Sequence, residues 1–583
     1  MALRGAQAPR RLQRPRDQQI AKGFLAAIGL AACGAAAAAA PTSVPTFHSL
    51  GLYWSPDGGS EERAATVQFR EKGSAGWREA LPLWFDARNS EYRGSIVELR
   101  PGTEYEIRLS LERGRSETLT AKTWSEEFRV KKTVQVPAGS PRLVINPADS
   151  GSEAEGYVVF TAAPGRNVID QDALAGNESC VVVKQGTHHV IIRGLELRNC
   201  RRYGVSLERQ FEPVLDTQTH DIVIEDNRIS GWGGTRDKEG QVADWDGAVH
   251  CNYWRETDDA KRPSRIVIQR NTLFNPRHGS NPWRSGTPSQ KHPSGPQGVT
   301  FDRCGSNHVI RHNTIYSDNG KRFMDGLGGG DNFSAKGFPW ADSDIYGNRI
   351  SQAFDDGIEA EGGNRNVRIW GNYLDEVFTA IANASVTVGP LYVWRNVSNR
   401  MGGMNNPELG PDREERGPFI KGGSRNPQMN GGRAYYFHNT ALQPAGAGTR
   451  YPLGAGWGIS KQAGTLFNFV SRNNIWQIHK EPLINGEPKF WSIRADGDKG
   501  PVDADYDLYN GQLANAGRNA QRHGFAGRPV YAVGARGDFS LKKNSPGFGA
   551  AERIPNFNDQ YPKPDVGAHQ SGTPPMRFGA EAL

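Results

Sequence analysis

The sequence predicts an all-β protein, in which a long solenoid of parallel coils follows a small antiparallel β-sandwich. Short strands of alternating apolar residues, each carrying an asparagine in the same setting, recur along the C-terminal part of the chain. Glycine is abundant, with 70 residues in 583, as tight corners between strands require. The region 128–583 is too long for one ordinary core, whereas a solenoid lengthens by adding coils.

The recurring asparagines define the coils. Two of their intervals, 348–372 and 372–396, are 24 residues each, and the others are longer. A strand motif that returns at this interval predicts one coil, with the longer intervals carrying inserted loops. Each Asn is expected to lie at a bend and to hydrogen-bond its counterparts in the coils on either side, so its role is structural. The expected members are Asn227, Asn271, Asn313, Asn348, Asn372, Asn396, Asn439 and Asn473.

The N-terminal segment predicts export. Residues 1–33 combine several basic residues with an apolar run that is too short to span a membrane, and this is typical of a secretory signal peptide. The run Leu30–Cys33 resembles a bacterial lipobox, which implies that Cys33 is lipidated. The alternative is an ordinary signal peptide that is cut at a later alanine. The protein is therefore expected in the outer membrane or periplasm as a lipoprotein, and otherwise secreted.

The net charge gives no support for a nucleic-acid partner, and the number of cysteines is consistent with disulfides. The net charge is +7, and most of it lies in the segment 1–33, so that the mature protein carries only a small positive charge and nucleic-acid binding gains no support. Cys180, Cys200, Cys251 and Cys304 remain after this segment, and an even number permits disulfides in an oxidising compartment. Cys180 and Cys200 lie about one short coil apart. A monomer, with membrane contact only through the lipid, is expected.

A linker (34–44) leads into the sandwich, which is expected over residues 45–127. Its alternating segments, LGLYW, ATVQFRE, SIVELR and TEYEIRLSLE, are separated by Gly, Pro and Ser. The stretch Leu99–Tyr105 resembles the fibronectin type III signature, in which the tyrosine hydroxyl bonds back to the chain. Trp54 resembles the core tryptophan of that family. The resemblance implies a fold and no catalytic role.

The solenoid, residues 128–583, resembles the right-handed parallel β-helix of pectate lyases, polygalacturonases and related secreted bacterial proteins. The ending SPGFGAA with Asp565–His569 is similar to the closing strands of such proteins. The resemblance implies a polysaccharide partner.

A second recurring strand, aligned by its glycines, points to the candidate site. Its apolar column, expected to face the core, is Val205, Ala248, Val299, Leu327, Ile358, Ala382, Ile420 and Ile459. Strand alternation then places Glu359 and Glu361 side by side on the outer face, after Asp355. The neighbouring coils present Gly328 and Gly330 on one side and Asn383 on the other, with Lys421 and Asp302 each about 10 Å away. We expect an exposed wall, on which the bare glycines let a sugar chain approach.

The preferred chemistry is β-elimination on a uronate-containing polysaccharide. Glu359, Glu361 and Asn383 would hold calcium through hard oxygen ligands, and Lys421 or Arg365 would remove the C5 proton. The Glu-x-Glu pair resembles the metal-binding pair of polysaccharide lyase family six. That family places a lysine shortly after the pair, whereas this sequence has none there.

Three alternatives stay open. A glycoside hydrolase would draw two carboxylates from Asp355, Asp356, Glu359, Glu361, Asp325 and Asp331. The pair Asp355–Asp356 resembles the adjacent aspartates of polygalacturonases, although alternation points Asp356 away from Asp355. A non-catalytic polysaccharide-binding protein would use tryptophans such as Trp340 for stacking. The acidic strand could also be only a solvated surface. His250, His278 and His292 are further candidate acids or bases.

Overall fold

The computed structural model describes residues 40–163, 168–171, 179–208, 217–234, 246–283, 292–317, 321–384, 387–401, 404–405, 414–415, 417–442, 457–461, 464–478 and 491–582. Cys33 and the expected signal peptide lie outside these residues. Among the described residues, no helix is long and apolar enough to cross a membrane.

An antiparallel β-domain comes first. Its seven strands follow the order β1-β2-β5-β4-β3-β6-β7. The strands are β1 (Thr42–Pro45), β2 (Leu50–Trp54), β3 (Ala65–Glu71), β4 (Arg78–Asp86), β5 (Glu91–Ile96), β6 (Glu104–Leu111) and β7 (Ser116–Lys122). Trp54 is buried in its core, and the Tyr105 hydroxyl accepts a hydrogen bond from the Arg100 amide at 2.9 Å. Both features expected from the fibronectin type III signature are therefore present.

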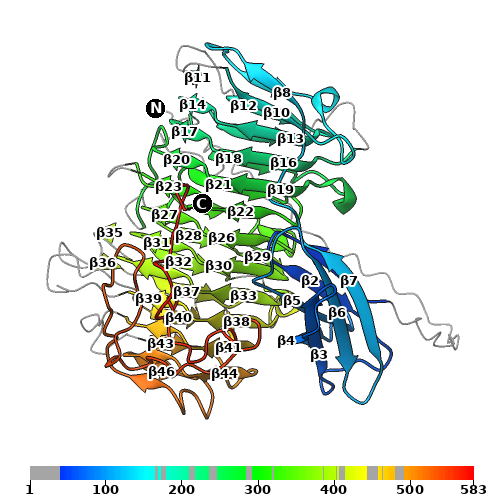
Figure 1. Cartoon of the computed structure of the whole chain (residues 1–583). Helices are drawn as coiled ribbons and strands as arrows, with labels where there is room; N and C mark the ends of the chain where they lie inside the picture. The colour runs from blue at the N-terminus through cyan, green and yellow to red at the C-terminus, as the bar shows by residue number, and fades with distance from the viewer. Residues whose placement is uncertain are drawn as a thin grey trace, which may run out of the picture. The chain divides into compact units, whose positions relative to one another are not determined.

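A parallel β-helix follows, in which the described residues form three sheets of twelve strands each (Figure 1). Sheet 1 contains β8 (Val130–Val136), β10 (Tyr157–Ala162), β13 (His188–Arg193), β16 (His220–Glu225), β19 (Ser264–Gln269), β22 (Val309–Arg311), β26 (Asp344–Tyr346), β30 (Val367–Trp370), β33 (Leu391–Trp394), β38 (Ala434–Phe437), β41 (Phe469–Arg472) and β44 (Val502–Asp505).

Sheet 2 contains β11 (Val168–Asp170), β14 (Glu196–Arg198), β17 (Arg228–Ser230), β20 (Thr272–Phe274), β23 (Thr314–Tyr316), β27 (Arg349–Ser351), β31 (Tyr373–Asp375), β34 (Val397–Asn399), β39 (Thr440–Ala441), β42 (Ile475–Trp476), β45 (Leu508–Tyr509) and β47 (Phe525–Ala526).

Sheet 3 contains β9 (Leu143–Ile145), β12 (Val181–Lys184), β15 (Val205–Glu208), β18 (Gly247–Asn252), β21 (Gln297–Asp302), β24 (Leu327–Gly328), β28 (Asp356–Glu359), β32 (Thr379–Ala382), β37 (Pro418–Gly422), β40 (Trp457–Lys461), β43 (Trp491–Arg494) and β46 (Gln512–Ala514).

Short elements complete the described fold. β25 (Pro339–Ala341) pairs with β29 (Gly362–Arg365), and β35 (Met404–Asn405) pairs with β36 (Glu414–Glu415). Three short 3₁₀ turns are η1 (Pro147–Asp149), η2 (Asp259–Lys261) and η4 (Pro427–Met429).

An asparagine ladder runs along the bend between sheets 1 and 2, as the sequence predicts. In Asn372, for example, the backbone N–H and the side-chain amide both donate to the Asn396 side-chain oxygen, at 3.0 and 2.9 Å. One member was wrongly assigned: Asn474 occupies the ladder, and Asn473 bonds instead to the backbone of Glu552. The ladder ends on Asp507, whose carboxylate accepts both donors of Asn474.

The core column of sheet 3 is correct in six coils and wrong by one residue in two. Val249 and not Ala248 pairs with Val205, and Ile381 and not Ala382 pairs with Ile358. A shift of one residue reverses every side chain of a strand. The outward residues are therefore His250 and Asn252 in the first coil and Ala382 in the second. The observed column reads Val205, Val249, Val299, Leu327, Ile358, Ile381, Ile420 and Ile459.

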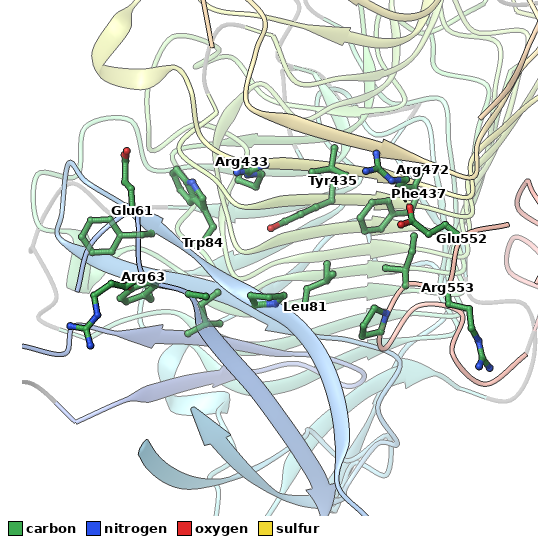
Figure 2. A pocket seen from close by; sticks show the side chains of 18 residues that line it. Glu61, Arg63, Leu81, Trp84, Arg433, Tyr435, Phe437, Arg472, Glu552 and Arg553 are labelled. Carbon is green, nitrogen blue, oxygen red and sulfur yellow. Dashed lines mark hydrogen bonds and ion pairs between the residues drawn. The ribbon is translucent and has the colours of Figure 1, made fainter. Parts of the chain in front are cut away.

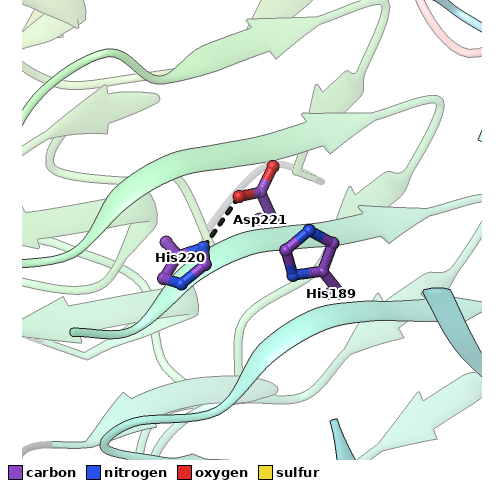
Figure 3. A group of neighbouring side chains, drawn as sticks. All are labelled: His189, His220 and Asp221. Atoms are coloured by element: carbon purple, nitrogen blue, oxygen red, sulfur yellow. Dashed lines mark hydrogen bonds and ion pairs between the residues drawn. The ribbon is translucent and has the colours of Figure 1, made fainter. Parts of the chain in front are cut away.

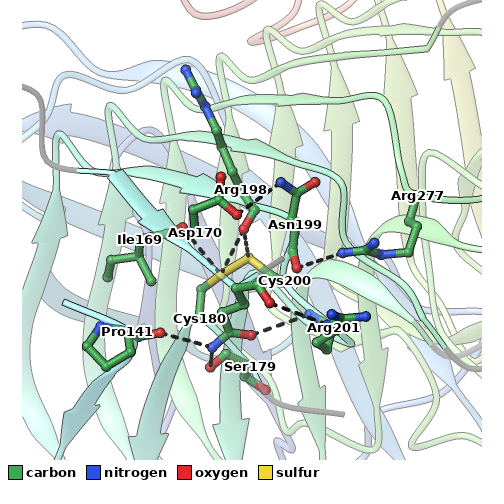
Figure 4. Close-up of a disulfide and its surroundings, with 11 residues drawn as sticks. Pro141, Ile169, Asp170, Ser179, Cys180, Arg198, Asn199, Cys200, Arg201 and Arg277 are labelled. Carbon is green, nitrogen blue, oxygen red and sulfur yellow. Dashed lines mark hydrogen bonds between the residues drawn. A yellow bond between two sulfur atoms is a disulfide. The ribbon is translucent and has the colours of Figure 1, made fainter. Parts of the chain in front are cut away.

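The four cysteines of the described residues are paired. Cys180 bonds to Cys200, beside the carbonyls of Ile169 and Arg198 (Figure 4), and Cys251 bonds to Cys304. The sequence spacing permitted the first of these pairs. Two disulfides indicate a protein that matures outside the reducing cytoplasm.

The β-domain is bound to the outer face of sheet 1. The Tyr53 hydroxyl donates to Asp342 at 2.7 Å, and the Ser95 amide donates to the Tyr392 hydroxyl at 3.0 Å. Beneath these contacts Arg368 forms an ion pair with Asp344, and both side chains are fully buried.

Candidate functional site: carboxylates around Lys421

Adjacent coils of sheet 3 bring together a cluster of acids around one lysine. β28 presents Glu359 outward, because Ile358 faces the core. The next coil places Ala382 beside Glu359, and the coil after that places Lys421 beside Ala382. Since Ala382 carries only a methyl group, the Lys421 side chain reaches across this coil. Its Nζ lies 2.8 Å from Asp356 Oδ2 and 3.0 Å from Glu361 Oε1, whereas the strand spacing alone predicts about 10 Å.

Asp355 and Asp356 both belong to this cluster. Strand alternation keeps Asp355 on the side of Glu359 and points Asp356 away from it, and the prediction for Asp356 is wrong: Asp356 is the first residue of β28, next to the bend, and its carboxylate lies beside Lys421. The Asp355 carboxylate lies 3.1 Å from His292 Nε2. Asp325 enters from the preceding coil, where its Oδ1 accepts the Asp356 amide at 2.9 Å.

The coil that contains Gly328 and Gly329 accommodates the Glu359 side chain. A Cβ atom at Gly328 would lie 2.6 Å from Glu359 Oε2, so a side chain there would displace the Glu359 carboxylate from its present position. The Gly329 amide donates to the same oxygen at 3.3 Å, and Asn332 donates to Glu359 Oε1 at 2.7 Å. The glycines therefore make room for the carboxylate, and the space beside Gly328 is not an empty notch for a sugar chain.

The predicted exposure of the acids is wrong. Glu359 and Glu361 are 4% and 5% exposed, and Asp325, Asp355 and Asp356 are buried as well. The solvent-accessible groups of the described cluster are Lys421, whose side chain is 19% exposed, and His292, whose side chain is 58% exposed. A substrate approaching the described cluster would meet these two basic groups first.

Burial and mutual repulsion disfavour ionisation of the acids. Desolvation, followed by repulsion from neighbouring carboxylates, raises the pKa of Asp325, Asp356 and Glu359 well above the usual values. The pKa of Glu361 is raised by burial too, against the attraction of Lys421. These groups need protons or a cation to remain buried together.

The remaining groups of the cluster are held charged. Burial alone would raise the pKa of Asp355, but Lys421 and His292 outweigh it and lower that pKa. Burial opposes the charge of Lys421, but attraction from Asp356 and Glu361 prevails and raises its pKa well above the usual range. Burial would also lower the pKa of His292, yet its hydrogen bond to Asp355 raises that pKa to about 9.

The donor set fits a hard divalent cation. Asp325, Asp356 and Glu359 each offer a carboxylate oxygen, and these oxygens lie within 4.8 Å of one another. Asp356 Oδ1 is buried and accepts no hydrogen bond. Calcium takes carboxylate oxygens at 2.3–2.6 Å, so oxygens on opposite sides of one ion lie about 4.6–5.2 Å apart. Glu361 and Asn383, the other two ligands expected from the sequence, do not belong to this set. Glu361 pairs with Lys421, and Asn383 points into the tube.

Four other predicted site residues lie apart from the cluster. Asn383 turns into the tube and donates to the Tyr436 hydroxyl at 3.0 Å, because of the register shift in β32. The Arg365 guanidinium lies over the Tyr53 ring of the β-domain at 5.7 Å. Trp340 lies 5.9 Å from the Lys336 ammonium. Asp302 bonds to the Gly330 amide, and burial raises its pKa to about 6.

Sequence reasoning ranked Asp325, Asp356 and His292 too low. A DG pair recurs just before β24 and at the start of β28, and a repeated acid at the same position of two coils is a signal for a stacked carboxylate pair. His292 lies about thirty residues before Asp325 in a Pro-rich stretch, and nothing in the sequence pairs it with Asp355.

A groove of about 430 Å³ lies elsewhere, between the β-domain and sheet 1 (Figure 2). Trp84, Tyr435, Phe437 and Arg433 are among its lining residues, and it contains none of the predicted site residues.

Comparisons with known proteins identify no family. No protein-family model and no curated protein matches the chain. Among solved structures, pectate lyase PelI from Erwinia chrysanthemi is similar at 9% identity, over 61% of this chain and 85% of that chain, with a TM-score of 0.16. A similarity this low says nothing about activity, and the β-helix described above is established by the strand registers of this chain.

Proposed function

We propose that this protein is an exported enzyme that cleaves a uronate-containing polysaccharide by β-elimination, with a divalent cation held by Asp325, Asp356 and Glu359. The observation that carries the proposal is the convergence of these three buried carboxylates, whose oxygens lie within 4.8 Å of one another beside Lys421. Like-charged groups this close and this buried require neutralisation.

The separation of the carboxylates favours a cation over direct hydrolysis. Retaining glycosidases hold their two carboxyl groups about 5–5.5 Å apart, and inverting enzymes about 6.5–9.5 Å apart. Here one oxygen of each of three carboxylates lies within 4.8 Å of the others, which matches the span of ligands around calcium.

The basic groups of the cluster have separate roles in this proposal. A bound calcium ion would neutralise the substrate carboxylate and acidify the C5 proton. Lys421 Nζ would accept that proton in its neutral form, and a cation held by Asp356 would favour this form, because it would repel the ammonium and engage the carboxylate that now stabilises its charge. The C5–H electrons form the C4–C5 double bond while the C4–O bond breaks. His292, kept protonated by Asp355 and exposed to solvent, would donate the proton to the leaving oxygen.

Hydrolysis is the second candidate, because one observation favours it. The raised pKa of the buried Glu359 suits a carboxylic acid that stays protonated at neutral pH and acts as a general acid. A protein that only binds polysaccharide would show neither activity. We further propose that Cys33 is lipidated, which incorporation of labelled palmitate into the wild type but not into Cys33→Ser would test.

The purified mature protein should be screened against acidic and neutral polysaccharides, with ultraviolet absorbance for unsaturated sugars and a reducing-end assay. Elimination gives both signals and is lost with chelator, whereas hydrolysis gives reducing ends alone. Lys421→Met should lower kcat by about 10²–10⁴-fold. Glu359→Gln should raise the calcium concentration needed for activity.

Glu208→Gln is the matched control, because Glu208 lies on the same sheet and pairs with Lys184, far from the cluster. The control should keep wild-type activity. The proposed active site is wrong if Lys421→Met and Glu359→Gln both cleave the polysaccharide at the wild-type rate. The proposed activity is wrong if no polymer in the panel is cleaved.

A further inference from the structure

A second group of potential metal ligands lies on sheet 1, formed by two neighbouring coils. β13 begins with His188 and His189, and β16 begins with His220 and Asp221. The register pairs His188 with His220 and Val190 with Ile222. His189 and Asp221 adopt left-handed backbone conformations, with φ of 50° and 53°, and they turn outward at the same place in successive coils (Figure 3).

Three of these side chains converge. One ligand atom from each of His189, His220 and Asp221 lies within 4.8 Å of the other two. His220 Nδ1 lies 2.7 Å from Asp221 Oδ2, as Figure 3 shows. The His188 ring stacks on the His220 ring with centroids 5.0 Å apart and an interplanar angle of 5°, which holds the His220 ring in place.

Two hydrogen bonds orient the Asp221 carboxylate. Arg265 Nε donates to Asp221 Oδ1 at 2.8 Å, and the Tyr157 hydroxyl donates to the same oxygen at 3.2 Å. Oδ1 is therefore occupied, and Oδ2 faces the imidazole of His220. Hydrogen bonds of this kind to a ligating carboxylate are the usual outer support of a metal site.

We propose that His189, His220 and Asp221 bind one divalent transition-metal ion, with zinc as the preferred ion. Two imidazoles and one carboxylate are a donor set of intermediate softness, which suits zinc and not calcium. Three protein ligands leave the fourth tetrahedral position open.

The three proposed ligands line a cavity. His189, His220 and Asp221 line a space of about 320 Å³ together with Trp124, Phe128 and Tyr157. The ion would therefore keep a water or accept a small anionic or imidazole-like ligand at its open fourth position. Arg265 adds a positive charge beside the site, which weakens cation binding and favours an anionic fourth ligand.

The test is a zinc titration by calorimetry on protein without a histidine tag, after removal of metals with chelator. One zinc ion per chain is expected. His189→Gln and His220→Gln should each weaken binding at least about 10-fold. Cobalt should give the visible absorption of a tetrahedral complex with nitrogen and oxygen ligands.

His523→Gln is the matched control, because His523 Nδ1 also lies 2.8 Å from an aspartate, Asp505, but no third ligand joins this pair among the described residues. This variant should bind zinc as the wild type does. Glu359→Gln should also bind zinc as the wild type does, because Glu359 belongs to the calcium site proposed above and not to the zinc site. The proposal is overturned if the wild type binds no zinc, or if His189→Gln and His220→Gln bind it with unchanged affinity and cobalt spectrum.

Discussion

At the scale of single residues, the candidate site depends on which side chains are small. Ala382 leaves room for Lys421 to reach Asp356 and Glu361, and Gly328 leaves room for the Glu359 carboxylate. The result is a buried group of acids whose charge is balanced only in part by Lys421 and His292. The free energy of unfolding should therefore respond to protons and to cations at this place.

The substitution Glu359→Gln tests this response. The folded protein holds the Glu359 proton to a higher pH than the unfolded chain, whose glutamates ionise near pH 4.3. Stability from this group is complete at low pH and is lost as the pH rises. In chelator, the variant should equal the wild type near pH 4 and exceed it by about 1 kcal/mol or more near pH 7.

Thermal unfolding followed by circular dichroism measures the difference. Calcium should raise the midpoint of the wild type more than that of the variant. Equal destabilisation of Glu359→Gln at both pH values would contradict the prediction that the ionised Glu359 carboxylate destabilises the folded protein. That outcome would mean that the hydrogen bonds from Asn332 and Gly329 dominate.

Period-two alternation was sufficient to predict the outward direction of Glu359, Glu361 and Lys421 from the sequence. It failed at Asn383, because the segment TAIANAS offers two neighbouring apolar residues and no glycine to fix the register. It also pointed Asp356, the first residue of β28, away from the cluster, and it could not place His292, since a loop has no period. Burial of the acids was unpredictable too, because it depends on segments that are distant in the sequence.

At the scale of elements, the asparagine ladder ties the coils together. Each member from Asn271 to Asn474 accepts two hydrogen bonds on its side-chain oxygen and donates from its amide to a backbone carbonyl of the preceding coil, as Asn372 does to Ile345 at 3.0 Å. The recurrence of the motif predicted this arrangement. It could not distinguish Asn473 from Asn474, because both follow the same arginine and only the three-dimensional bend selects one of them.

Replacement of one ladder residue should be costly. Asn372→Ala leaves the amides of Asn348 and several other buried polar groups without partners, each worth about 1–3 kcal/mol. We expect a loss of about 2–5 kcal/mol in urea unfolding. Asn544→Ala, at an exposed position, should change stability by no more than about 0.5 kcal/mol. Equal effects of the two substitutions would contradict a structural role for the ladder.

At the scale of the whole molecule, the β-domain and the β-helix share a buried polar interface. Arg368 of β30 pairs with Asp344 of β26 and also donates to Ser95 of the β-domain at 3.3 Å. The fibronectin type III signature predicted the fold of the first domain. It carried no information on this contact, because the partners are more than 270 residues apart and neither belongs to the signature.

Because Arg368 of this ion pair also donates to Ser95 of the β-domain, we expect the two domains to unfold together. Arg368→Ala leaves Asp344 buried and uncompensated, and should cost about 3–5 kcal/mol. The double variant Arg368→Met with Asp344→Leu should recover much of this loss. Calorimetry would measure both, with Arg113→Ala, at a 91% exposed side chain, as the control. Two separate transitions in the wild type, with only one shifted by Arg368→Ala, would show that the domains unfold independently.

The ladder also has a direction. Each ladder asparagine donates its backbone N–H and a side-chain N–H to the side-chain oxygen of the next coil toward the C-terminus, and the series stops at Asp507, which has no side-chain N–H and whose own backbone N–H donates to Gln521. An asparagine added in a coil after Asp507 would receive no hydrogen bond from it. A repeat inserted before Asp507 would instead continue the ladder on both sides.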